Sequence, residues 1–274
     1  MKFGFVAPFG DARAAADLAR EAERSGWDGF FVWEPVWSID AWVCLSAAAM
    51  VTQTIRLGTM LSPISRMRPW DLAGKAATLD NLSGGRVILS VGLGAVDTGF
   101  AEFGEETDRA RRAELVDEGL DILRGLWKGQ PFQYEGRHYH VRETRFFPPP
   151  PPVQARIPIW MVGVWPKKKS MRRVLRCDGW IPAAVNAAGQ MGQALPEDLH
   201  AAKAWMEAQR PDGAPLDVIV EGVTPGREPQ EASGLVRPWA EAGATWWMEA
   251  MWTVERSQGM DPLVERLRQG PPPV

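Results

Sequence analysis

Apolar residues fall along this chain in two kinds of block. Short runs rich in β-branched residues alternate with longer stretches whose apolar positions recur every three or four residues. The clearest example begins with an apolar run at Ile55–Leu61, followed by Ser62–Pro69, where prolines and arginines leave no helix or strand expected. The spacing then predicts a helix over Trp70–Leu82 and a second buried strand over Arg86–Val91. Two apolar strands joined by a helix predict a parallel, right-handed βαβ unit.

The same alternation extends along the whole sequence. The other predicted strands are Lys2–Ala7, Gly29–Glu34, Ile157–Val162, Gly179–Ala183, Asp217–Gly222 and Thr245–Ala250. The other predicted helices are Asp11–Ser25, Asp40–Val51, Arg109–Trp127, Lys167–Arg176, Glu197–Gln209, Glu231–Ala242 and Asp261–Arg268. Gly129–Arg156 interrupts this order with a proline run and a hairpin expected around Glu135, and Val185–Pro196 is expected to be a loop. Eight strand–helix alternations with one insertion predict a single (β/α)8 TIM barrel over residues 1–274.

Length and charge agree with a soluble barrel. The 274 residues are close to the roughly 250 of such a fold, and the net charge of −3 disfavours a general nucleic-acid-binding surface. The opening MKFGFVAPFGDA is too short and too interrupted for a signal peptide or a membrane span. Cys44 and Cys177 form no disulfide framework, so we expect a cytoplasmic protein. No histidine or cysteine spacing suits a metal, and we expect no metal site.

A series of motifs spans most of the chain. They are, in order, GWDGFFVWEP, LGTMLSPISRMRPWDLA, TLDNLSGGRVILSVGLG, FGEETDRARRAELVDEGLDIL, YEGRHYHV, IPIWMVG, DGWIP and AGATWWMEA. In this order they resemble the bacterial luciferase-like flavin-dependent oxidoreductases. The resemblance implies a (β/α)8 barrel with an insertion before its fifth strand. It also implies a flavin-type cofactor, FMN or the deazaflavin F420, bound at the carboxyl ends of the strands.

Candidate cofactor-binding residues follow the predicted strands. The resemblance implies a non-prolyl cis peptide that supports the flavin ring, at Met60–Leu61. Glycines after the fourth strand allow close approach of a ligand to the backbone. The loop after the fifth strand precedes three lysines, and the resemblance implies a cofactor phosphate there, although the turn after the seventh strand is an alternative. The expected cofactor-binding set is Pro8, Trp33, Met60, Leu61, Gly92, Gly94, Val162, Gly163, Val164 and Trp180.

Catalytic and substrate-binding candidates lie in the loops after strands two and three. Glu34 lies between two tryptophans, so desolvation can raise its pKa and suit it to acid–base catalysis. The alternative is a capping or salt-bridge role at the barrel rim. The histidine that many members of the family carry near this position is absent. Trp37, Arg66 and Arg68 are candidates for contact with the substrate.

Three interpretations of function remain open at this stage. The first is a monooxygenase that acts on a small organic substrate, with a flavin reductase as partner and a homodimer as assembly. The second is hydride transfer through F420. The third is a flavin-binding protein without turnover, since fold alone does not fix function. A hydrolase is disfavoured because no serine or cysteine has a histidine nearby in the sequence.

Overall fold

A closed barrel of parallel strands forms the centre of the computed structural model, which describes residues 1–145, 149–185, 191–210, 213 and 215–274. The predicted (β/α)8 fold is confirmed. Its strands are β1 (Lys2–Ala7), β2 (Gly29–Val32), β3 (Arg56–Pro63), β4 (Val87–Gly92), β7 (Ile159–Trp165), β8 (Gly179–Val185), β10 (Asp217–Gly222) and β11 (Trp246–Ala250). Pairing of β10 with β8 closes the barrel.

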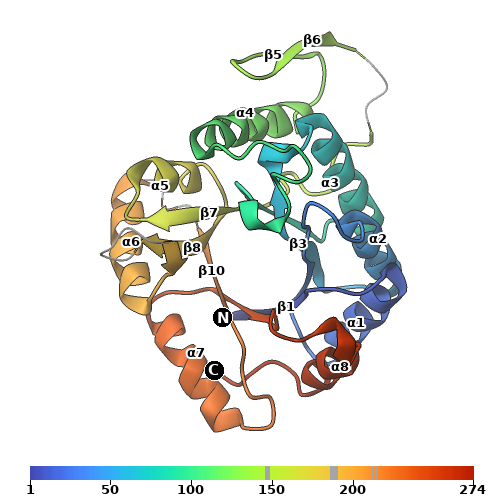
Figure 1. The fold of residues 1–274 in the computed structure, drawn as a ribbon, viewed down its shortest axis with the longest axis vertical. Helices are drawn as coiled ribbons and strands as arrows, with labels where there is room; N and C mark the ends of the chain where they lie inside the picture. The colour runs from blue at the N-terminus through green and yellow to red at the C-terminus, as the bar shows by residue number, and fades with distance from the viewer. Residues whose placement is uncertain (146–148, 186–190, 211–212, 214) are drawn as a thin grey trace.

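Helices surround the barrel, as Figure 1 shows in a view down the ring of strands. They are α1 (Ala12–Arg24), α2 (Ala41–Val51), α3 (Pro69–Ser83), α4 (Arg109–Trp127), α5 (Lys168–Val174), α6 (Pro196–Gln209), α7 (Pro229–Glu241) and α8 (Asp261–Arg268). Local sequence fixes several ends. Asp11 accepts a hydrogen bond from the Ala14 amide at 2.8 Å, and Asp40 accepts one from Trp42 at 2.8 Å. Gly84, at φ 68°, ends α3 in the left-handed conformation.

Two apolar layers hold the strands, because both faces of each strand are buried. The larger layer lies between the barrel and the helices. The smaller fills the barrel interior, where the ring centroids of Phe31 and Trp160 lie 5.4 Å apart and those of Trp160 and Trp246 lie 5.1 Å apart. These rings occupy the interior of the barrel, so ligand binding is left to the carboxyl ends of the strands.

Three segments differ from the sequence-based expectation. Strand β3 continues through Pro63 and is followed by a 3₁₀ turn, Ile64–Arg66, so the expectation of no strand or helix over Ser62–Pro69 is wrong. Strand β7 runs to Trp165, and a short strand β9 (Met191–Gln193) pairs with β8 inside the expected loop Val185–Pro196. In each case hydrogen bonding to a neighbouring strand extends the regular structure.

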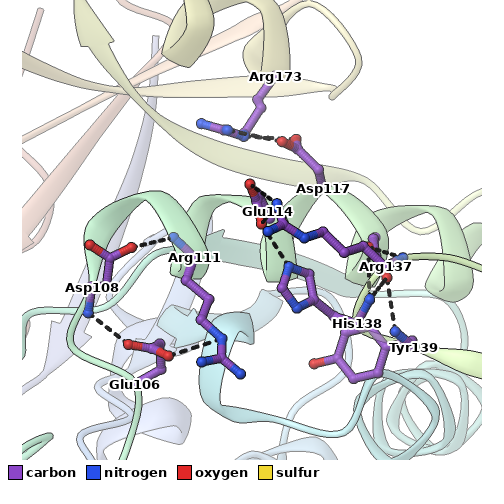
Figure 2. A network of polar contacts seen from close by, with 10 residues as sticks. Glu106, Asp108, Arg111, Glu114, Asp117, Arg137, His138, Tyr139 and Arg173 are labelled. Atoms are coloured by element: carbon purple, nitrogen blue, oxygen red, sulfur yellow. Dashed lines mark hydrogen bonds and ion pairs between the residues drawn. The ribbon is translucent and has the colours of Figure 1, made fainter.

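The insertion contains the expected hairpin, formed by β5 (Phe132–Glu135) and β6 (His140–Thr144). It lies outside the barrel beside α4 (Figure 1). Glu118 of α4 accepts hydrogen bonds from the backbone amides of Arg137, His138 and Tyr139. Figure 2 shows Glu114 contacting both the Arg137 and His138 side chains, at 2.9 and 2.7 Å. His138 therefore links the hairpin to α4.

Two remaining observations concern the limits of the fold. Phe146, Phe147 and Pro148, the aromatic pair and the first residue of the predicted proline run, lie outside the described residues. None of the helices described is both long and apolar enough to cross a bilayer.

Candidate functional site

A bulge in β3 forms one side of the barrel mouth. The peptide bond between Met60 and Leu61 is cis, which confirms the predicted position, and the pairing register with β4 shifts between Thr59 and Ser62. Met60 is buried within the barrel interior, whereas Leu61 is half-buried. The bulge therefore presents backbone and an apolar side chain at the carboxyl end of β3.

Glu34 lies behind this bulge, on the side of the helices. One carboxylate oxygen accepts a hydrogen bond from the Ser62 hydroxyl, and the other accepts one from Trp42 Nε1 of α2 at 3.2 Å. The Ser62 hydroxyl is also 2.8 Å from Thr59 Oγ1. Both oxygens of Glu34 are thus engaged by groups that fix the bulge and α2.

Burial raises the pKa of the Glu34 carboxyl above its ordinary value, as the sequence predicts. The Ser62 hydrogen bond, the charges of Arg66 and Lys75, and the Trp42 hydrogen bond oppose this increase. Glu34 is absent from the lining of the cavity described below. Among the described residues Glu34 makes neither the cap nor the salt bridge weighed from the sequence but hydrogen bonds to Ser62 and Trp42, and its acid–base role stays a prediction.

Gly92, at the end of β4, faces the bulge across the mouth. A Cβ atom at this position would lie 3.2 Å from Leu61 Cδ1 and 3.2 Å from Val162 Cγ2. Gly92 itself is buried, and the missing side chain lets the half-buried Leu61 and Val162 side chains pack together over its backbone. A flat, largely apolar ring fits that surface, so the residues present suit the ring of a flavin-type cofactor. Pro8 is buried at the end of β1.

Gly94 is glycine for a local reason. Its φ is 80°, and a Cβ there would lie 2.8 Å from Pro63 Cβ. The carbonyl groups of Leu93 and Gly94 accept hydrogen bonds from Arg112 at 3.0 and 2.8 Å, which fixes the loop after β4.

Two cofactor-binding candidates do not face the mouth. Trp180 is fully buried in the layer between the barrel and the helices, and its indole donates to the carbonyl of Gly163 at 2.9 Å. The open side of Gly163 accommodates that same indole, because a Cβ would lie 2.7 Å from Trp180 Nε1. Val162–Val164 belongs to strand β7 rather than to a loop, and the Val164 amide donates to Ser170 Oγ at 3.0 Å. Trp180 thus lies away from the mouth of the barrel, and its contact with the cofactor stays a prediction.

The three substrate-contact candidates have different surroundings. Arg66 donates to the Pro35 carbonyl at 2.9 Å, and its buried Nε has no partner among the described residues. Arg68 is exposed over the ring of Trp70. Trp37 is 80% exposed and stacks on Phe103, with ring centroids 6.2 Å apart. Only Arg66 lies beside Glu34 and the bulge.

A cavity of about 480 Å³ opens at the carboxyl ends of β8, β10 and β11. Its lining includes Glu221, whose carboxylate accepts a hydrogen bond from Trp252 Nε1 at 3.0 Å. Burial raises the pKa of Glu221, and the Trp252 hydrogen bond opposes this. Trp33 contacts Trp252 edge to face, with centroids 6.0 Å apart. Sequence reasoning missed Glu221, although a lone glutamate near the end of the apolar strand Asp217–Gly222 was an available signal.

Among the described residues, no group of three or more histidine, cysteine or acidic side chains could hold a metal ion. The candidate site combines an apolar bulge, the aliphatic side chains of Leu61 and Val162 over Gly92, and a cavity lined by a carboxylate.

A (β/α)8 barrel with a ligand-sized cavity at the carboxyl ends of its strands is the architecture on which many enzymes place their active sites. The chain belongs to the luciferase-like monooxygenase family, whose model matches residues 1–267.

A relative from Mycobacterium tuberculosis is named provisionally as a coenzyme F420-dependent oxidoreductase. It is 33% identical over 179 residues, which are 61% of this chain and 50% of that protein. The chain thus spans about half the length of this relative.

Two solved structures share the fold. The coenzyme F420-dependent tetrahydromethanopterin reductase from Methanopyrus kandleri has a TM-score of 0.74 at 17% identity and covers 98% of this chain and 96% of its own. The oxygenating constituent of 3,6-diketocamphane monooxygenase from Pseudomonas putida, in complex with FMN, has a TM-score of 0.72 at 15% identity, with the same coverage. At these identities the likeness concerns the fold alone.

Proposed function

We propose that this protein is an oxidoreductase that binds FMN or F420 with the ring of the cofactor against the β3 bulge. The observation that carries the proposal is the cis peptide Met60–Leu61 at the barrel mouth, where the half-buried Leu61 and Val162 side chains form an apolar surface over Gly92. Family membership and the names of the relatives support the same class of cofactor. The cofactor supplies the electron transfer, and the protein supplies binding, orientation and exclusion of water.

The chain's own residues divide this work. Leu61 and Val162 provide aliphatic contacts on either side of Gly92. Glu34 and Ser62 hold the bulge in place from behind through their hydrogen bond. Met60 closes the interior of the barrel below the bulge, since it packs in the interior apolar layer.

The leading reaction is oxygenation of a small organic substrate by a reduced flavin, with a flavin reductase as partner. The second candidate is hydride transfer through F420, which the names of the mycobacterial relative and the Methanopyrus enzyme favour. A homodimeric assembly and a cytoplasmic location remain parts of this proposal. Turnover of a substrate by the cofactor-loaded protein would exclude the third interpretation, a flavin-binding protein without catalysis.

Thermal unfolding in the presence of FMN and of F420 tests the proposal. A ligand that binds the native state alone raises the melting temperature with its concentration. We expect one of the two cofactors to raise it, and Gly92→Ala to weaken that increase, because the new Cβ, 3.2 Å from Leu61 Cδ1 and from Val162 Cγ2, would displace the side chains that form the proposed ring surface.

Gly74→Ala is the matched control, since a Cβ at Gly74 meets nothing within 4 Å. It should leave the cofactor-dependent increase unchanged. If neither cofactor shifts the melt of the wild-type protein, the proposed function is wrong.

A further inference from the structure

The cavity at Glu221 exists because two neighbouring barrel strands separate. Strands β8 and β10 pair only near their amino ends, at Gly179 with Asp217 and at Trp180 with Val218. Further along, β8 pairs instead with β9. The carboxyl halves of β8 and β10 therefore have no direct ladder between them, and the cavity of about 480 Å³ lies there. Its volume is that of a pocket for a small organic molecule.

The part of the chain that the structure describes lines this cavity with one charged side chain. The lining residues are Ile181, Pro182, Gln193, Ala194, Ile219, Val220, Glu221, Gly222, Val223, Trp239, Ala250, Trp252 and Thr253. Among these described residues Glu221 is the only acidic one, and none is lysine or arginine. Most of the other side chains are aliphatic or aromatic. The cavity thus combines an apolar wall with a single carboxylate.

The carboxylate is held in place but not neutralised. Trp252 Nε1 binds one oxygen at 3.0 Å, and within the described part of the chain the other oxygen has no hydrogen-bond partner. Gln193 Nε2 binds the backbone carbonyl of Glu221 at 2.9 Å and so fixes the strand that carries it. Glu221 is half-buried, and partial removal of a carboxylate from water is unfavourable, which is why burial raises the pKa of Glu221.

We propose that Glu221 is the specificity-determining group of a subsite for a small organic cation, an amine in its ammonium form. The apolar part of the amine lies against Ile181 and Ile219, and the ammonium group donates to the Glu221 oxygen that Trp252 does not contact. An ammonium group supplies the missing counter-charge, and hydrogen bonds between charged partners are the strong ones. Trp239 and Trp252 line the same cavity and add aromatic surface, which favours cations.

The claim that this cation is the substrate of the redox reaction rests on the proposed function. The claim that the cation binds at Glu221 is independent of it. The test therefore uses the protein without cofactor and three probes of similar size: cyclohexylammonium, cyclohexanol and cyclohexanecarboxylate. Isothermal titration calorimetry near neutral pH measures their dissociation constants. We expect the wild-type protein to bind the ammonium at least about tenfold more tightly than the alcohol, and the carboxylate most weakly.

Glu221→Gln should remove the preference for the ammonium, because glutamine keeps the size of the side chain but not its charge. Glu102→Gln is the matched control, since Glu102 is exposed in the loop after β4, and it should keep the preference. Glu221→Asp and Trp252→Phe retain the negative charge and should also keep the preference. These two variants carry the test if Glu221→Gln does not unfold cooperatively.

Equal or tighter binding of the alcohol by the wild-type protein overturns the proposal. A preference for the ammonium that survives in Glu221→Gln also overturns it. So does the loss of this preference in both Glu221→Asp and Trp252→Phe, which retain the negative charge. The effect of FMN and F420 on the melting temperature is measured in a separate experiment. Ammonium binding without a cofactor effect would overturn only the redox function, and the reverse result would overturn only this subsite.

Discussion

Replacement of Glu34 by glutamine tests whether this carboxyl supports the bulge or transfers a proton. Glutamine can still accept the Trp42 indole hydrogen bond through its oxygen and can donate to the Ser62 hydroxyl, which is able to turn towards Thr59. At low pH, where the Glu34 carboxyl is neutral, the two proteins should differ in unfolding free energy by no more than about 1 kcal/mol.

The difference between the two proteins should change with pH in one direction. The folded protein holds the Glu34 proton to a higher pH than the unfolded chain, because burial raises the pKa. Between the unfolded and folded pKa values the native state therefore binds more protons, and the wild-type protein loses stability as pH rises. One proton limits this loss to about 1.4 kcal/mol per pH unit. The glutamine variant has no such loss at this position, so its relative stability should increase as pH rises.

Urea unfolding of both proteins across a series of pH values measures this difference. A wild-type protein that gains stability over the variant as pH rises would show a lowered pKa and refute the reasoning. Turnover provides a second measurement. A supporting role predicts a change within about tenfold, whereas direct proton transfer by Glu34 predicts a loss of about 10²–10⁴-fold.

Two further predictions concern the close packing at Gly163 and the buried ion pair between Arg266 and Glu249. Gly163→Ala should destabilise the fold by about 1–3 kcal/mol, because the new Cβ would lie 2.7 Å from Trp180 Nε1, while Gly74→Ala in α3 should be neutral or slightly stabilising in the same urea titration. Arg266→Met should cost about 3–5 kcal/mol, since it leaves the buried Glu249 without the cation 3.1 Å away. Arg268→Met should cost less than about 1 kcal/mol, because Arg268 is 66% exposed beside Glu21, and equal effects of the two arginine variants in thermal unfolding would contradict this account.

The sequence alone was sufficient for the barrel and for most element boundaries. Strands β1 and β10 and helices α4 and α8 lie at their predicted residues, because a short apolar run or a periodic stretch with a defined cap admits one local structure. The position of the cis peptide was also available, but only through the resemblance of LGTMLSP to the family motif.

Which face of a strand a residue occupies was decided by the tertiary structure. The barrel strands are apolar on both faces, so alternation carries no contrast between the interior and the side of the helices. Trp180 therefore looked equally suited to either face, and the fold places it against the helices. The same ambiguity applies at the ends of the strands. The sequence could not tell that Glu34 faces Trp42 of α2 whereas Glu221 lines the cavity.

The cavity itself also depends on tertiary structure. It lies where β8 leaves β10 and pairs with β9, and the backbone hydrogen bonds that make this choice join residues far apart in the sequence. The sequence thus determined the number, order and limits of the repeating units and the presence of an isolated glutamate in an apolar strand. Only the closure of the barrel determined that this glutamate meets a space large enough for a ligand, because strand pairing between distant segments has no local signal.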